Sequence, residues 1–156
     1  MSLTAWRIVV RRFARTAFDG EGARLYGGRW NSRGVAIVYT AQSQSLAALE
    51  MLANAESTTL LQNYVLIPVE IDPNLIRTVD ALTLPKNWQT YPPPQELRNI
   101  GDHWVAQGTS CVLQVPSVIV PAESNFLLNP RHADFRRLKI GKPVRFRFDP
   151  RLLPRK

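Results

Sequence analysis

The stretch YGGRWNSRG, residues 26–34, combines residue types that suit a phosphate-bearing ligand. Gly27 and Gly28 let the backbone come close to a ligand and reach unusual conformations. Arg29 can grip a phosphate through two parallel hydrogen bonds, and Tyr26 and Trp30 offer flat faces for a base. The stretch is neither a Walker A loop nor a GxGxxG fingerprint. It indicates a nucleotide pocket, with a glycine turn carrying an exposed arginine as the alternative.

Glu50 is the second residue whose placement suggests chemistry. It belongs to a helix predicted over residues 43–57. On a helical wheel it lies about 40° from Leu46 and about 60° from Ala53, at the margin of the apolar face. A carboxylate there costs free energy unless a partner pairs with it. An active-site cleft would supply that partner; the alternative is a glutamate that reaches solvent.

Three further residues stand where a ligand-contacting side chain is expected. Tyr39 ends the strand that precedes the Glu50 helix, and strand ends commonly face clefts, although a core tyrosine is the alternative. Ser117 follows Pro116 between two apolar runs. Since no histidine or aspartate forms an evident triad with it, a hydroxyl that positions a ligand is the better reading. Asn125 is a weaker candidate, because an asparagine in a turn often bonds its own backbone.

Composition excludes several classes of protein. The chain has 156 residues, which suits one domain spanning residues 1–156. Cys111 is its only cysteine and lies in an apolar run, so it is expected to be a buried hydrophobe rather than a disulfide or zinc ligand. His103 and His132 form no metal-binding motif, so no metal is expected. Neither a membrane span nor a signal peptide is expected, which points to the cytoplasm.

Positive charge is concentrated near the end of the sequence. The formal net charge is +8, and residues 131–156 hold ten basic and two acidic residues while residues 1–130 balance. Such a region suggests an acidic partner, either nucleic acid or protein, with a merely solvated surface as the alternative. The alternation in RFRFD, residues 145–149, predicts an edge strand with one wet face.

The elements that must position these residues follow from the pattern of apolar and turn residues. We expect strands at 5–10, 35–40, 63–72 and 144–149, with Pro68 bending the third strand or placing it at an edge. Residues 111–121 predict one or two strands broken at Pro116.

The two predicted helices are 43–57, capped by Ser43 or Ser45, and 95–108, begun by Pro94 and ended by Gly108. Residues 18–31 and 123–135 are expected to be loops or turns. The order is not a βαβ rhythm, so an α+β fold with mixed or antiparallel sheets is predicted.

Taken together, GGRWN, VYTAQSQSLAALE and VPSVIVPAESNFLLNP resemble the RES-domain family, the toxins of bacterial toxin–antitoxin pairs. The family is named after an arginine, a glutamate and a serine, which correspond to Arg29, Glu50 and Ser117. The resemblance runs from Trp6 to about Leu153. It implies an ADP-ribosyltransferase-like fold: two small packed β-sheets flanked by helices, with NAD bound in a cleft between them.

The same resemblance implies an activity and a partner. Such a toxin consumes NAD by hydrolysis or phosphorolysis, or it transfers ADP-ribose to a specific protein. Its cognate antitoxin carries a helix-turn-helix domain, blocks the cleft and uses the toxin as co-repressor. The toxin would then meet DNA only indirectly, through a complex that can include a homodimer. A basic nucleic-acid-binding protein is the less favoured alternative from another class.

These expectations assign roles to the candidate residues. Cleaving the nicotinamide–ribose bond builds positive charge on the ribose. Glu50 can stabilise that charge as a carboxylate does in glycoside hydrolysis, or it can hold the ribose hydroxyls. Arg29 would hold the pyrophosphate, Tyr39 would stack on nicotinamide and Ser117 would hydrogen-bond the ligand. The expected catalytic residues are Glu50, Arg29 and Ser117, and the expected NAD-binding residues are Arg29, Tyr39, Trp30, Tyr26, Gly28, Ser117 and Asn125.

Overall fold

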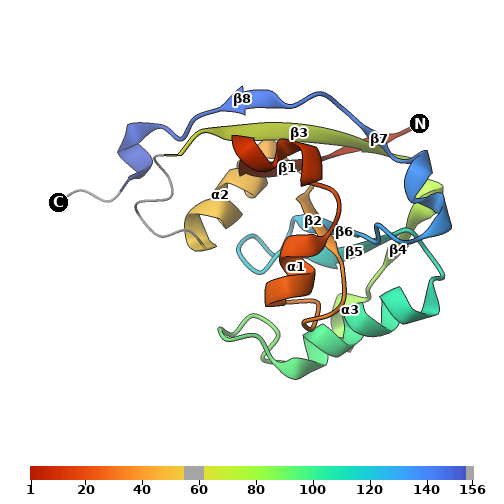
Figure 1. The fold of residues 1–156 in the computed structure, drawn as a ribbon. Coiled ribbons are helices and arrows are strands. Elements are labelled where there is room, and N and C mark those ends of the chain that lie inside the picture. The colour runs from red at the N-terminus through yellow and green to blue at the C-terminus, as the bar shows by residue number, and fades with distance from the viewer. Residues whose placement is uncertain (55–61, 154–156) are drawn as a thin grey trace.

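A curled β-sheet forms the centre of the computed structural model, which describes residues 1–54 and 62–153 (Figure 1). The strand order is β4–β5–β6–β2–β1–β3–β7, and β8 also pairs with β3. These strands pair antiparallel except for the parallel β4–β5 pair, which confirms the predicted α+β class. The strands are β1 (Leu3–Val10), β2 (Val38–Ala41), β3 (Tyr64–Ile71), β4 (Ile76–Thr78), β5 (Val112–Pro116), β6 (Ser124–Leu128), β7 (Lys139–Ile140) and β8 (Val144–Phe146).

The two small sheets expected from the sequence are two halves of this one sheet. One half holds β1, β3, β7 and β8, and the other holds β2, β6, β5 and β4. The ladder between β1 and β2 consists of the single pair Trp6 and Ala41. Because so few hydrogen bonds join the two halves there, the sheet can bend between them. They share a core in which Ala5 and Val69 of the first half pack with Val38 and Leu128 of the second.

Pro68 lies inside β3, which is flanked on both sides rather than at an edge. On one side β1 pairs along the whole strand. On the other side, β8 pairs with residues 64–66 and β7 with residues 69 and 70. Pro68 falls between these two partners, where its missing N–H interrupts neither ladder. Its carbonyl still accepts a hydrogen bond from the Gly141 N–H at 2.8 Å.

The helices cover the sheet at separate places (Figure 1). They are α1 (Glu21–Tyr26), α2 (Gln44–Asn54) and α3 (Gln95–Gln107), with the 3₁₀ segments η1 (Arg11–Thr16), η3 (Pro73–Leu75), η4 (Ala81–Thr83), η5 (Ala133–Arg137) and η6 (Pro150–Leu152). The helix begun by Pro94 is confirmed as α3, which ends at Gly108 in the left-handed conformation. Ser43 caps α2 by accepting the Leu46 N–H, and residues 55–57 of that prediction lie outside the described residues.

Two of the predicted loops are wrong. Residues 18–31 contain α1, a helix too short to show an apolar period. Residues 124–128 form β6, which lies between β5 and β2 and is buried on both faces. Asn125 inside this segment and Asn129 after it are residues typical of turns, whereas a strand covered on both faces needs no polar alternation. Among the described residues, no helix is long and apolar enough to cross a membrane.

Candidate active site

Arg29 is anchored by main-chain oxygens. Its Nη1 donates hydrogen bonds to the carbonyls of Trp88 and Thr90, each at 3.0 Å. Within the described residues, its Nε and Nη2 have no hydrogen-bond partner in the protein. Partial burial lowers the pKa of Arg29, opposed by Tyr39 and Tyr91. The guanidinium is therefore held in one orientation, with a pair of donors left for a bidentate oxygen ligand such as a phosphate.

Asn31 organises the loop that carries Arg29. Its side chain is fully buried, and its Nδ2 donates to the carbonyls of Ala23, Val35 and Ser32 at 2.8, 3.0 and 3.2 Å. Its Oδ1 accepts the hydroxyl of Tyr39 at 2.6 Å. One amide thus joins the end of α1, the loop and β2. Asn31 was not among the predicted site residues, although it closes the GGRWN motif.

Tyr39 and Gly28 fit together beside this amide. The Tyr39 hydroxyl donates to Asn31 and accepts the Trp30 N–H at 3.1 Å. A Cβ on Gly28 would lie 2.6 Å from that hydroxyl oxygen, so the glycine leaves room for the tyrosine. Burial raises the pKa of Tyr39, and the phenol stays neutral. The predicted NAD-binding role of both residues stays a prediction, but each has a structural task inside the protein.

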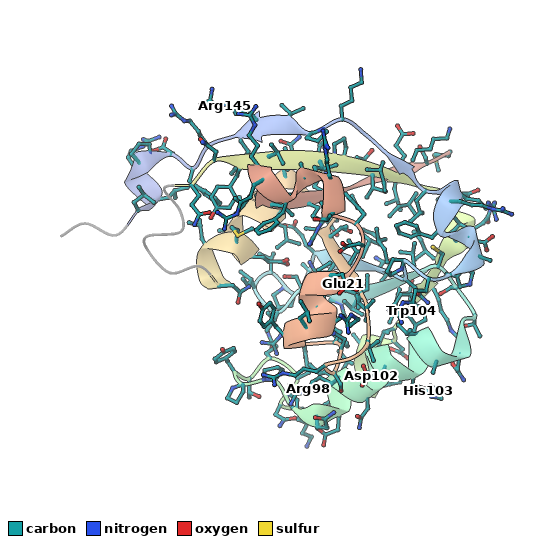
Figure 2. The ribbon with its side chains drawn as sticks, viewed as in Figure 1. Glu21, Arg98, Asp102, His103, Trp104 and Arg145 are labelled. Atoms are coloured by element: carbon teal, nitrogen blue, oxygen red, sulfur yellow. The ribbon has the colours of Figure 1, made fainter. Side chains whose placement is uncertain are left out.

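Helix α3 supports the same loop from below. Gly101 packs against the loop so closely that a Cβ there would overlap the carbonyl oxygen of Trp30. The carboxylate of Asp102 accepts the Ser32 N–H at 2.9 Å. Figure 2 shows Asp102 on the side of α3 that faces α1. Residues 73–100 carry no recognisable motif, yet the Trp88 and Thr90 carbonyls in this segment hold Arg29, and α3 holds its loop.

Glu50, Ser117 and Asn125 come together from three separate elements. The Nδ2 of Asn125 donates to both carboxylate oxygens of Glu50, at 2.8 and 2.9 Å, and to the Thr40 carbonyl at 3.1 Å. The Ser117 hydroxyl donates to Oε1 of Glu50 at 3.2 Å. The partner that a carboxylate at the margin of an apolar face requires is thus present, and it consists of two neutral donors.

The carboxylate of Glu50 lies in a partly desolvated position. Burial raises its pKa, the hydrogen bonds from Asn125 and Ser117 lower it, and the charge of Glu123 raises it; the net direction is upward. A raised pKa in a partly buried carboxylate held by neighbours is typical of functional sites. Within the described residues, no cation is in ion-pair contact with Glu50, so its negative charge is left for a ligand to balance.

The Arg29 loop and the Glu50 carboxylate with its hydrogen-bond partners adjoin the same face of the β2–β6 pair. Tyr39 is paired with Leu127 and Ala41 with Asn125, so all four side chains share this face. Tyr39 and Asn125 are diagonal neighbours, for which Cβ separations of about 7–8 Å are usual. The Arg29 loop packs on this face through Trp30 and Leu127, and α2 packs near Ala41. The structure therefore assembles four of the predicted residues, Arg29, Tyr39, Glu50 and Asn125, around one surface.

The remaining predicted residues differ in how far they are exposed to solvent. Ser117 is fully buried, and its Oγ also accepts the N–H groups of Ile119 and Val120 at 3.2 Å, so its hydrogen bonds are fully used. Trp30 is 2 % exposed in the core, so its ring has no free face for a base. Tyr26 is 77 % exposed at the end of α1 and keeps a free ring. Asn125 bonds Glu50 rather than its own turn, because it lies in a strand.

Arg7 is a structural element of the site that the sequence reading missed. Its Nε donates to the Ala17 carbonyl at 2.7 Å and its Nη1 to the Tyr39 carbonyl at 3.0 Å. Burial lowers the pKa of Arg7 to about 10, opposed by Asp19. Because β1 and β2 separate after the Trp6–Ala41 pair, the guanidinium supplies the donor that β2 lacks there. An arginine within the apolar strand AWRIVV was the available signal.

A surface hollow elsewhere has no part in this arrangement. Its volume is about 400 Å³, and it is lined by Met1, Ser2, Glu70, Asp72, Arg137 and Lys139. Arg137 and Asp72 form an ion pair across it at 3.8 Å. It contains none of the predicted site residues, and its acidic and basic groups balance one another.

Comparison with known proteins identifies the family. The model of the RES domain matches residues 4–149. The chain belongs to the RES domain family. This RES domain is 42% identical over 148 residues to a protein named Toxin Res from Yersinia enterocolitica, covering 94% of this chain and 97% of the relative. It is 36% identical to a protein named Prs ADP-ribosylating toxin from a Sphingobium species, covering 98% of each chain.

The same fold occurs in a solved structure. This RES domain matches a chain from the crystal structure of the M. tuberculosis MbcT–MbcA toxin–antitoxin complex with a TM-score of 0.76. The match covers 94% of this chain and 85% of the other at 20% sequence identity. The fold is therefore retained although most side chains differ.

Proposed function

We propose that this RES domain is the toxin of a toxin–antitoxin pair and that it cleaves the bond between nicotinamide and ribose in NAD. The observation that carries the chemistry is the Glu50 carboxylate, which Asn125 and Ser117 hold and which has no ion-pair partner among residues 1–54 and 62–153. The relatives named Toxin Res and Prs ADP-ribosylating toxin support the biological role and the use of NAD.

The site residues divide the work between binding and bond cleavage. As nicotinamide departs, positive charge develops on the ribose, and a fixed carboxylate in a partly desolvated position stabilises it. The free donors of Arg29 hold the pyrophosphate. Nicotinamide leaves as a neutral molecule, so the reaction needs no strong general acid. Tyr39, with its hydroxyl already engaged, contributes the face of its ring.

Transfer of ADP-ribose to a protein is the second candidate reaction. It is favoured by the 36% identity to the Sphingobium protein, whose name states that it ADP-ribosylates. Both reactions use the same carboxylate and differ only in the acceptor, which is water, phosphate or a protein side chain. We place the toxin in the cytoplasm, where cellular NAD is available, with an antitoxin that covers the site.

The test follows nicotinamide release from NAD by chromatography, with and without phosphate, using protein freed of antitoxin. Glu50→Gln should lower turnover by at least about a hundredfold, since a single preorganised electrostatic group is commonly worth that much. The control is Glu96→Gln, an exposed glutamate in the first turn of α3, which should keep the parent rate.

The products distinguish the acceptors. Free ADP-ribose indicates hydrolysis, and ADP-ribose phosphate that appears only with phosphate indicates phosphorolysis. Label from NAD that becomes attached to a lysate protein indicates transfer. Parent-like turnover in Glu50→Gln would refute the assigned role of the carboxylate, and absence of release in all three conditions would refute NAD cleavage.

A further inference from the structure

Five arginines from the two ends of the chain gather on one surface away from the candidate active site. Arg11, Arg12 and Arg15 belong to η1, and Arg145 and Arg147 lie in and just after β8. All five are exposed, and we call them the arginine patch. Figure 1 shows β3 between η1, drawn in red, and β8, and Figure 2 labels Arg145 at β8.

The strand register brings the two segments together. The Arg11 N–H donates to the Asn63 carbonyl at 2.8 Å on one side of β3. On the other side, Phe146 pairs with Tyr64 and Arg145 with Val65. Val65 also packs in the small cluster with Ala14 and Ala17, so Arg145 and η1 share one face of β3.

The opposite face of these strands carries α2. Tyr64 and Leu66 pack there with Leu46 of α2 and with Phe148. The predicted alternation of RFRF is thus confirmed, with phenylalanines inward and arginines outward. The helix that carries Glu50 and the arginine patch lie on opposite faces, so a large ligand on the patch leaves Glu50 uncovered.

The patch retains its positive charge. Among the described residues, none of its five guanidinium groups forms an ion pair, and neither η1 nor β8 contains an acidic residue. The other basic part of the chain differs, because Arg137 contacts Asp72 and Asp134 at 3.8 and 3.7 Å. Along the sequence, the excess of positive charge lies in residues 131–156. In the fold, Arg11, Arg12 and Arg15 from residues 1–130, which have no net charge, join two arginines of that region.

We propose that the arginine patch binds the phosphate backbone of double-stranded DNA directly. Interfaces with nucleic acid are much more positive than interfaces between proteins, whose centres are depleted of charge and rich in apolar residues. The arginine patch is dominated by charge, although it includes Phe13, which is 50 % exposed in η1 and has the Arg12 guanidinium 4.9 Å from the centre of its ring. Single-stranded nucleic acid is bound largely by stacking of successive bases on aromatic rings, whereas here Phe146 and Phe148 face the core, which leaves the patch with Phe13 alone.

This contact goes beyond both the proposed NAD chemistry and the expectation that DNA is met only through the antitoxin. It is independent of sequence, since phosphate contacts position a protein without reading bases. With the patch on DNA and the antitoxin on the opposite face, a repressor complex would hold the duplex through both proteins.

The test is salt-dependent binding of the antitoxin-free protein to a labelled duplex of mixed sequence. Five phosphate contacts predict a slope of about −4.5 in log affinity against log salt, or roughly 500-fold weaker binding at 200 mM than at 50 mM salt. The triple variant Arg11→Gln, Arg12→Gln, Arg15→Gln leaves two contacts. Its slope should fall to about −1.8, and its loss over the same range to roughly 12-fold.

The control removes the same charge elsewhere: Arg131→Gln, Arg136→Gln, Lys139→Gln, three exposed residues just before η5, in η5 and in β7. It should keep the parent slope, and thermal unfolding checks that both triple variants are folded. An equal loss in the control, tighter binding to a single strand than to the duplex, or no duplex binding at low salt would each overturn the proposal. Nicotinamide release is measured separately, so failure of the NAD reaction leaves this result readable.

Discussion

Arg29 and Glu50 both carry charge beside one face of the β2–β6 pair, but main-chain atoms hold the first and side chains hold the second. Arg29 donates to two carbonyls, and its loop is fixed by Asn31 and by the close approach of Gly101. Glu50 is held by the amide of Asn125 and the hydroxyl of Ser117.

The difference in how Arg29 and Glu50 are held matches their proposed roles, Arg29 as a binding group and Glu50 as a reacting group. Main-chain carbonyls do not titrate and move only with the fold, so they suit a cation that orients a ligand. Glu50 sits where burial raises its pKa and hydrogen bonds oppose the rise. Its ionisation is therefore set by a few side chains. We expect substitutions in the residues that hold the Arg29 loop to act through folding, and substitutions in the residues that hold Glu50 to act through its protonation.

The largest expected effect is on the Arg29 side. Gly101→Ala places a methyl group on the Trp30 carbonyl, in a contact between a helix and a loop that has no room to relax. We expect a loss of about 3 kcal/mol, at the upper end for overpacking. For a chain of this size that lowers the Tm by roughly 6–12 °C.

Gly22→Ala is the matched control for this prediction. Gly22 lies in α1 on the same side of the molecule, and a Cβ there meets nothing within 4 Å. Alanine also suits a helix better than glycine, so the variant should equal or slightly exceed the parent in Tm. If differential scanning calorimetry gave the two variants the same Tm, the close packing of α3 against the loop would not be what holds Arg29.

The contrast also explains what the sequence could and could not show. GGRWN is continuous, so its glycines and Arg29 were found by their types and spacing alone. Glu50 was found because helical geometry places it beside an apolar face. The partners of both residues are far away in the chain: the Trp88 carbonyl lies 59 positions from Arg29 and Asn125 lies 75 positions from Glu50. No local pattern records such contacts.

The secondary-structure errors have the same origin. β6 was mistaken for turns because Asn125 and Asn129 are turn formers in isolation, yet one binds Glu50 and both are buried. The sheet's curl depends on β1 and β2 pairing at one position only, and Arg7 satisfies β2 beyond it. Tertiary contacts override local preference at these places. They adjoin the residues proposed to carry the chemistry, as expected of functional sites.

The next largest expected effect is on the ionisation of Glu50, which depends on the side chains that hold it. Asn125→Leu removes the donor shared by both carboxylate oxygens, and Ser117→Ala removes only the longer bond. Each change takes away a hydrogen bond that favours the ionised form, so the pKa of Glu50 should rise in both. Because the proposed catalysis uses the ionised carboxylate, the acid limb of the profile of kcat/KM against pH should move to higher pH, and further in Asn125→Leu.

The expected loss in kcat/KM at neutral pH follows from the hydrogen bonds that each variant removes. Losing one to a charged group commonly costs about 1.5–3 kcal/mol, which is roughly a tenfold to hundredfold loss in kcat/KM for Asn125→Leu. Arg29→Lys is the comparison variant, since it should lower affinity for NAD without moving the acid limb. A limb that stays in place in Asn125→Leu would show that these two donors do not set the ionisation of Glu50.

The smallest expected effect is a gain in the stability of the folded protein, opposite in sign to the loss expected for Gly101→Ala. Because burial raises the pKa of Glu50 in the folded state, the folded protein binds a proton there more tightly than the unfolded chain does. By linkage, stability from this group is present while the carboxyl is protonated and is lost as pH rises through the folded pKa. Glu50→Gln removes that loss, so at neutral pH it should stabilise the protein by on the order of 0.5 kcal/mol while lowering turnover by at least about a hundredfold. Unfolding in urea across acidic and neutral pH measures this gain, which should shrink as pH falls, whereas Glu96→Gln should show no such trend. If Glu50→Gln destabilised the protein at neutral pH, the ionised carboxylate would be a support of the fold, and both sides of the site would then be structural in the same sense.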